Sequence, residues 1–276
     1  DIFEKAIHFI DLFRLKTKDP TMLAKIKHIE IRILEKQNKM DDVYQKSKHY
    51  LIEYGVLFEW SNIKGIYVLL KHISTVIRYK KSIFNLDVMC DHDIEMNHIL
   101  SICERFLVAS YWRIYYSDNK NLNNYYLTSQ SVIYIALQTA RIGNFEVSPL
   151  IPLYLVFFYG DRFHITKAFK YAKLMIKMLD NSPHNIYIQY MSLYYMRLSP
   201  LLYTYELSIQ NLKSNYHLLM NSLDYSIASS ALHYVFVFRL LAAYSLPLII
   251  DELFEMTDST KDLGFYFDMI TPIIPI

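Results

Sequence analysis

The sequence predicts an all-α protein built from stacked antiparallel helix pairs. Glycine is scarce, with 5 residues in a chain of 276, whereas β-rich folds use glycine in tight turns and bulges. Apolar residues recur at the 3.6-residue spacing of amphipathic helices along most of the chain. Short polar or proline-containing breaks separate these segments, so consecutive helices are expected to fold back on one another.

The first predicted pair lies near the N-terminus. Residues 21–37 carry an apolar stripe interrupted by Glu30, which consists of Leu23, Ile26, Ile29, Ile33 and Leu34. Asp41 or Asp42 is expected to cap a second helix, and Gly55 to end it. The stripe of that helix is Val43, Ser47, Tyr50, Leu51 and Tyr54. Both helices have apolar faces that a single hairpin cannot bury, which predicts a neighbouring hairpin.

A second pair is predicted in the middle of the chain. Pro149 and Pro152 suit the first turn of a helix that runs to Tyr159, and Gly160 and Asp161 form a turn. The following helix extends to about residue 179, with one apolar face formed by Ile165, Ala168, Phe169, Ala172, Met175, Ile176 and Leu179. Its opposite face carries Lys167, Lys170, Lys173 and Lys177. The alanines allow a neighbouring helix to approach closely, as in tetratricopeptide hairpins.

The remaining segments extend the same pattern. Residues 63–116 are predicted to form long helices, and two further pairs join residues 183–198 with 203–220 and residues 224–244 with 247–256. The polar breaks at 117–124 and 180–184 are too short for interdomain linkers. We therefore expect one domain over residues 1–276, folded as a tetratricopeptide-like right-handed solenoid. The start at Asp1 and the proline-containing end at 271–276 suggest an excerpt of a longer protein.

Composition argues against several classes of protein. The 29 basic and 27 acidic residues give a net charge of +2, so no global field attracts nucleic acid or an anionic membrane. Residues 147–160 and 223–250 are apolar, but the first is short and contains two prolines, and the second contains Arg239. We interpret both as core helices rather than membrane spans. Two cysteines are too few for a disulfide-stapled module, which predicts a reducing, cytoplasmic location.

One cluster of residues carries side chains that can bind a metal ion. It consists of Cys90, His92, His98 and Cys103. Zinc accepts two thiolates and two imidazoles, but its ligand pairs normally sit two to four residues apart. His92 and His98 are six residues apart and point to different sides of a helix. We favour a helix start capped by Asp91 or Asp93, with both cysteines buried. Phosphate-binding loops, dinucleotide fingerprints, zinc-peptidase motifs and nucleophile elbows are absent from the sequence. No catalytic residue, metal ligand or cofactor is therefore predicted.

Two other groups of residues remain candidates. His164, His217 and His233 lie in apolar helices, where a general base is conceivable, but no partner nucleophile is visible and a structural role is preferred. Lys167, Lys170, Lys173 and Lys177 form a possible partner-binding surface for an acidic protein, with a solvated helix face as the alternative.

Four passages resemble the helical-repeat region of large predicted signalling ATPases fused to serine/threonine or histidine kinases. They are IKHIEIRILEKQNKMDDVYQKSKHYLIEYGV, MCDHDIEMNHILSICERFLVASY, SPLIPLYLVFFYGDRFHITKAFKYAKLMIKML and SLDYSIASSALHYVFVFRLLAAYSLPLIIDEL. The chain departs from that pattern at residues 222–224, which replace a glycine, and at Glu59 and Trp60, where a proline is usual.

The resemblance implies a noncatalytic repeat segment that transmits a signal, while a neighbouring domain hydrolyses nucleotide. The leading hypothesis is thus a protein-interaction and regulatory module whose partner is another protein or a flanking domain of the same chain. One alternative is a stand-alone scaffold or secreted effector that binds a foreign protein. A second alternative is an all-helical enzyme whose site is lined by His92, His98 and tyrosines.

Overall fold

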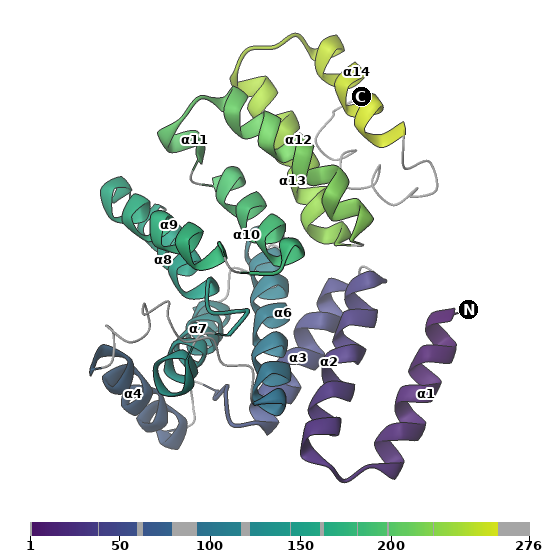
Figure 1. The fold of residues 1–276 in the computed structure, drawn as a ribbon, viewed down its shortest axis with the longest axis vertical. Coiled ribbons are helices and arrows are strands. Elements are labelled where there is room, and N and C mark those ends of the chain that lie inside the picture. The colour runs from purple at the N-terminus through teal and green to yellow at the C-terminus, as the bar shows by residue number, and fades with distance from the viewer. Residues whose placement is uncertain are drawn as a thin grey trace. The chain divides into compact units, whose positions relative to one another are not determined.

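The computed structural model shows a helical protein (Figure 1). It describes residues 2–37, 39–59, 63–78, 93–116, 122–143, 145–160, 163–180, 182–197, 199–222 and 224–258. Across these ranges every regular element is a helix and no strand is present, which confirms the predicted all-α class. The chain divides into two compact units, an N-terminal unit of Asp1–Ile151 and a C-terminal unit of Pro152–Ile276. A single solenoid over residues 1–276 remains a prediction.

The N-terminal unit is organised around one long helix. Its helices are α1 (Ile2–Lys16), α2 (Pro20–Lys36), α3 (Met40–Glu53), α4 (Ile63–Arg78), α6 (Ile94–Tyr116) and α7 (Leu122–Ile142). Helix α6 packs against α2 and α3, and also against α7 (Figure 1). The predicted contact between α2 and α3 is therefore confirmed. Where a neighbouring hairpin was expected, the apolar faces of both helices are covered by α6.

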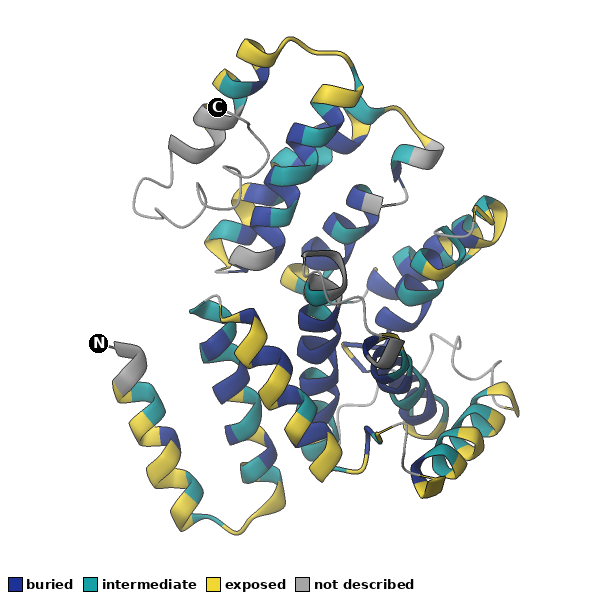
Figure 2. Ribbon diagram, turned by 180° about the vertical axis from the view of Figure 1, so that it is seen from behind, coloured by how far each residue is buried: buried dark blue, intermediate teal, exposed yellow. Residues whose placement is uncertain are grey.

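Helix α6 is largely buried in its central part, residues 99–110 (Figure 2). Leu100, Ile102 and Phe106 are fully inaccessible to solvent, and the Phe106 ring stacks on Tyr44 of α3 at a centroid distance of 5.2 Å. Aromatic contacts of this kind add to the hydrophobic stabilisation that comes from area burial. The centre of the unit is thus an apolar layer between α6 and the α2–α3 hairpin.

The helix caps differ in part from the prediction. Neither Asp41 nor Asp42 caps α3, because the helix begins at Met40 and both aspartates lie in its first turn. Lys39 takes the N-cap position instead, and its carbonyl accepts from the Val43 amide at 2.9 Å. The aspartates still favour the helix electrostatically, since its N-terminus carries partial positive charge.

Gly55 follows the end of α3, as the sequence predicts, and adopts the left-handed conformation with φ of 67°. The Val56 amide donates to the Leu51 carbonyl at 2.8 Å and the Gly55 amide to the Ile52 carbonyl at 3.0 Å, which is the Schellman pattern. A Cβ atom at Gly55 would meet no atom within 4 Å. Substitution therefore strains the backbone alone.

We expect Gly55→Ala to lower the free energy of unfolding by about 1 kcal/mol, because alanine disfavours positive φ. The measurement is the urea unfolding midpoint followed by circular dichroism. Gly160→Ala is the matched control, since Gly160 ends α8 without a positive φ and also has open space around it. Equal destabilisation by both substitutions would contradict the backbone explanation.

Glu30 is the largest departure from the predicted apolar stripe of α2. It is 4% exposed, and its carboxylate accepts hydrogen bonds from Arg14 of α1 and from Lys46 and Tyr50 of α3. Burial by itself raises the pKa of Glu30, but the three donors outweigh burial and hold the pKa below its usual value. The residue that interrupts the apolar stripe of α2 therefore joins α1, α2 and α3. By contrast, Ile29 of the predicted stripe is 41% exposed.

Helix α4 is held to α7 through the segment that precedes it. The side-chain amide of Gln130 on α7 both accepts from the Phe58 amide and donates to the Phe58 carbonyl, each at 2.9 Å. Gly65 of α4 packs on the Phe58 side chain so closely that an added Cβ would lie 2.3 Å from it. Glycine is required here for close approach, not for backbone conformation.

The described part of the C-terminal unit contains most of α8 (Leu150–Gly160) and the helices that follow it. These are α9 (Ile165–Leu179), α10 (His184–Arg197), α11 (Ser199–Leu202), α12 (Tyr205–Asn221), α13 (Tyr225–Leu241) and α14 (Leu246–Asp258). Within the described part of the chain, no helix combines the length and apolar character that crossing a bilayer requires. The predicted end at 271–276 lies outside the described residues.

Two predicted pairs in this unit are in contact, α10 with α12 and α13 with α14. The most extensive contacts, however, join α12 to α13, which belong to different predicted pairs, and α10 packs against both. Ala228 and Ala231 of α13 are fully buried, and such small side chains let α12 approach closely. Their core includes Leu212, Tyr216 and Leu219 of α12.

An ion-pair cluster joins α12, α13 and α14. Arg239 of α13 donates through Nε and Nη2 to Glu252 of α14 at 2.7 and 2.8 Å, and through Nη1 to Glu206 of α12 at 2.7 Å. Lys213 of α12 also contacts Glu252 at 2.7 Å. The hydrogen bonds from Arg239 outweigh burial and lower the pKa of Glu252 to about 2. Arg239 therefore lies in a polar cluster within an otherwise apolar stretch.

Candidate functional site

The four lysines of α9 lie together on the surface, as the sequence predicts. Lys167, Lys170, Lys173 and Lys177 are all exposed, and at 100° per residue they fall within about 120° of the helix circumference. Helix α9 contains no acidic residue. Its outer face therefore presents four positive charges with no carboxylate of the same helix among them.

Burial of the opposite face sets the direction of these lysines. Ala168, Ala172, Met175 and Leu179 are buried as predicted, and Met178 is buried as well, although the prediction did not include it. Phe169 and Ile176 are only half-buried. Because the alanine and methionine face packs inward, the helix cannot rotate to bury the lysines without exposing its apolar stripe.

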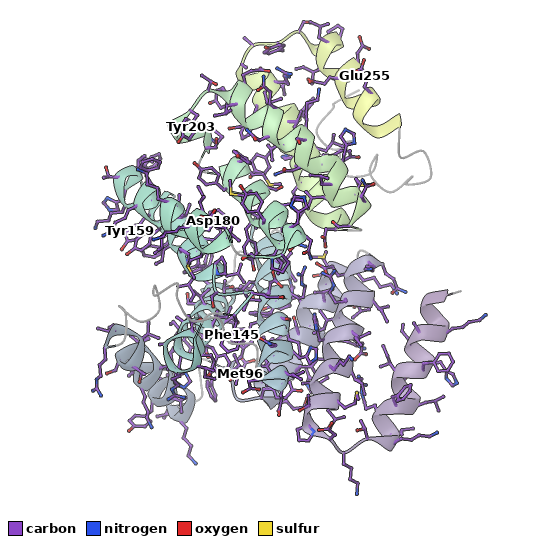
Figure 3. All side chains as sticks on the ribbon, viewed as in Figure 1. Met96, Phe145, Tyr159, Asp180, Tyr203 and Glu255 are labelled. Atoms are coloured by element: carbon purple, nitrogen blue, oxygen red, sulfur yellow. The ribbon has the colours of Figure 1, made fainter. Side chains whose placement is uncertain are left out.

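Aromatic rings border the lysines at the start of α9. Tyr159, near the end of α8, stacks on Tyr171 with a centroid distance of 5.6 Å and an interplanar angle of 1°. Its position beside α9 is seen in Figure 3, where Asp180 marks the other end of that helix. The Lys167 ammonium lies 5.3 Å from the Tyr159 ring centroid, and Lys173 lies 4.5 Å from that of Phe169. These cation–π contacts restrict both lysine side chains.

Phe163 adds an exposed aromatic side chain in the turn between α8 and α9. It is 85% exposed and has φ of 56°. The turn is closed by hydrogen bonds from the Phe163 amide to the Gly160 carbonyl and from the His164 amide to the Tyr159 carbonyl, both at 2.9 Å. A bulky residue in the left-handed region is strained and uncommon. We define the α9 surface as Lys167, Lys170, Lys173, Lys177, Tyr159 and Phe163.

The predicted metal-capable cluster is only partly described. Cys90 and His92 lie outside the described residues. Cys103 is fully buried on α6, where burial raises the pKa of its thiol, and His98 is half-buried on the same helix. Within the described ranges, no three His, Cys, Asp or Glu side chains lie close enough to hold a metal ion. The helix start is capped as expected at Asp93, whose Oδ1 accepts from the Met96 amide at 2.9 Å.

The three histidines considered as general bases occupy different surroundings. His164 precedes α9 and His217 lies on α12, and both are exposed. His233 on α13 is half-buried, and burial lowers its pKa. The structure thus brings no two of these three into one site. The histidines that the structure does bring into contact are His28 and His98. The sequence did not indicate this contact, because the two residues are far apart in the chain.

Comparisons with known proteins give no match to this chain: none is found among family models, curated proteins or solved structures. The α9 surface is therefore assessed on its chemistry. Exposed ammonium groups suit a polyanion or an acidic protein segment, and the adjacent exposed Phe163 suits an apolar contact.

Proposed function

We propose that this chain is a noncatalytic helical protein-interaction module that binds an acidic protein segment on the α9 surface. The observation that carries the proposal is the array of four exposed lysines on one helix face without an acidic residue. Rigid helices present such groups at little ordering cost. In line with the resemblance to signalling ATPases, the bound segment belongs to a partner or to a flanking domain, and its binding regulates the larger protein.

An acidic protein segment suits the α9 surface better than a nucleic acid. Single-stranded nucleic acids stack successive bases on several accessible aromatic faces. In the α9 surface only Phe163 offers an exposed ring, because Tyr159 is stacked on Tyr171 and also lies under Lys167. All four cations are lysines, whereas bidentate contacts to phosphate favour arginine. Carboxylates spaced along an acidic segment need only point charges, which lysine supplies.

The test is binding of a fluorescein-labelled oligoglutamate peptide, measured by anisotropy. We expect the fourfold variant Lys167→Glu, Lys170→Glu, Lys173→Glu and Lys177→Glu to bind about tenfold or more weakly, since each exposed ion pair contributes about 0.2–1 kcal/mol. Binding by the unmodified chain should also weaken as salt is added. Circular dichroism establishes that the variant keeps its helical content.

The matched control makes the same change in net charge at exposed lysines elsewhere. It combines Lys16→Glu, Lys18→Glu, Lys64→Glu and Lys71→Glu, and each of these lysines is exposed. Equal weakening by the control would show that the peptide senses total charge and not the α9 surface. Tighter binding of an oligothymidylate than of the peptide would replace the proposed partner with nucleic acid.

A further inference from the structure

Two histidines from different helices meet inside the N-terminal unit. The Nδ1 atoms of His28 on α2 and His98 on α6 are 3.4 Å apart, and the ring centroids are 5.6 Å apart with the planes tilted by 47°. One ring must donate and the other must accept for this contact to be a hydrogen bond. Protonation of both imidazoles removes the acceptor and places two like charges in contact.

The charged groups that act on this pair are positive. Arg32 of α2 and Arg105 of α6 act on His28, and Lys25 of α2 acts on His98. The nearby carboxylate of Glu35 is 2.9 Å from each of the two arginines. Arg32 and Arg105 thus share the carboxylate of Glu35 as a counterion. Both still act on His28 as positive charges.

The neighbouring helices direct their titratable groups elsewhere. At the end of α3, which packs on α2 and α6, Glu53 is paired with Lys27 at 2.7 Å, and Lys27 also lies 4.6 Å from the Tyr54 ring centroid. On α7, the Tyr134 hydroxyl lies 3.8 Å from the Met96 sulfur. From α1, Arg14 reaches Glu30.

Burial and these cations favour neutral imidazoles. Burial lowers the pKa of His28 to about 3, with Arg105, His98 and Arg32 acting in the same direction. Burial and Lys25 likewise lower the pKa of His98. A shared zinc ion fits less well, although a 3.4 Å separation suits two of its ligands. The same cations repel a dication, and the described residues supply no third ligand nearby.

We propose that the His28–His98 contact is a proton-sensitive latch between α2 and α6, closed while both imidazoles are neutral and released when the pair takes up protons. The direction follows from linkage. An unfolded histidine binds its proton near pH 6.5, whereas the folded pair binds protons only at lower pH, so the unfolded chain holds more protons in between. Stability contributed by neutral His28 is thus complete above about pH 6.5 and is lost progressively as the pH falls toward the folded pKa.

The experiment compares urea unfolding of the whole chain and of a His28→Phe/His98→Phe variant from pH 7.5 to pH 5. One histidine with a strongly lowered pKa reduces the folded-to-unfolded ratio by up to about tenfold per pH unit below its unfolded pKa. We therefore expect the unmodified chain to lose stability faster than the double variant. His217→Gln, which replaces an exposed histidine on α12, should retain the full pH dependence.

Imidazole proton resonances of the unmodified chain provide a second measurement that does not depend on the variant folding. The His28 signal should not titrate between pH 7.5 and pH 5.5, because burial lowers its pKa to about 3. Amide protection factors in α2 and α6, corrected for the slower intrinsic exchange at low pH, should fall toward the acid end of the range. Titration of His28 near pH 6.5, or an unchanged pH dependence in the folded double variant, would overturn the latch.

Discussion

Arg105→Met is expected to lower the free energy of unfolding by about 3 kcal/mol or more, the range seen when one partner of a buried ion pair is removed. The Arg105 side chain is 8% exposed and donates to Glu35 of α2 and to Glu104 of α6, each at 2.9 Å. Those carboxylates are themselves 11% and 7% exposed. Without Arg105, the carboxylates of Glu35 and Glu104 remain shielded from water in the folded chain but lose the cation that they share. The measurement is the urea midpoint followed by circular dichroism.

Arg32→Met is the matched control for this substitution. Arg32 also pairs with Glu35 at 2.9 Å, but its side chain is 28% exposed, so water replaces part of what the substitution removes. We expect it to cost about 1 kcal/mol or less, as exposed helix pairs do. A loss for Arg32→Met as large as that for Arg105→Met would show that burial does not decide the strength of this cluster.

The second large effect is expected for Leu219→Ala in the C-terminal unit. Leu219 is fully buried in the core that α12 forms with α13. Removing its side chain loses hydrophobic transfer energy and leaves a cavity, which together cost about 2–5 kcal/mol. The thermal unfolding midpoint and the urea midpoint should both fall.

The preceding residue supplies a control of the same chemistry. Leu218 lies one position earlier on α12 and is 38% exposed. Leu218→Ala should change the free energy of unfolding by less than about 1 kcal/mol, because its side chain borders water and its truncation leaves no enclosed cavity. If the two leucines proved equivalent, the packing of α12 on α13 through Leu219 would be wrong.

The α9 surface shows how far periodicity can predict a site. The spacing of Ala168, Ala172 and Met175 places one face of α9 inward, and the lysines then have to point outward. That conclusion needs only the geometry of one helix. The strained, exposed Phe163 and the stacking of Tyr159 on Tyr171 required the structure, since both depend on how the chain leaves α8 and enters α9.

Polar residues inside the N-terminal unit were harder to predict. Glu30 is a misfit in the apolar stripe of α2 when only that helix is considered, and its three donors come from α1 and α3. His98 was considered with Cys103 on its own helix, but its neighbour is His28. In both cases the partner lies on another helix. The periodicity of apolar residues along one helix does not predict which residues of other helices it contacts.

The helical secondary structure, most helix lengths and the outward direction of the α9 lysines follow from the amino-acid sequence. They depend on backbone hydrogen bonds and on the 3.6-residue spacing of apolar side chains, which act within a few turns of one helix. Tertiary packing alone decides that α12 pairs most extensively with α13, that Glu30 is neutralised by Arg14, and that His28 meets His98. Amphipathic helices can bury their apolar faces against several different neighbours. The choice among those neighbours depends on side-chain volume and charge across the whole core.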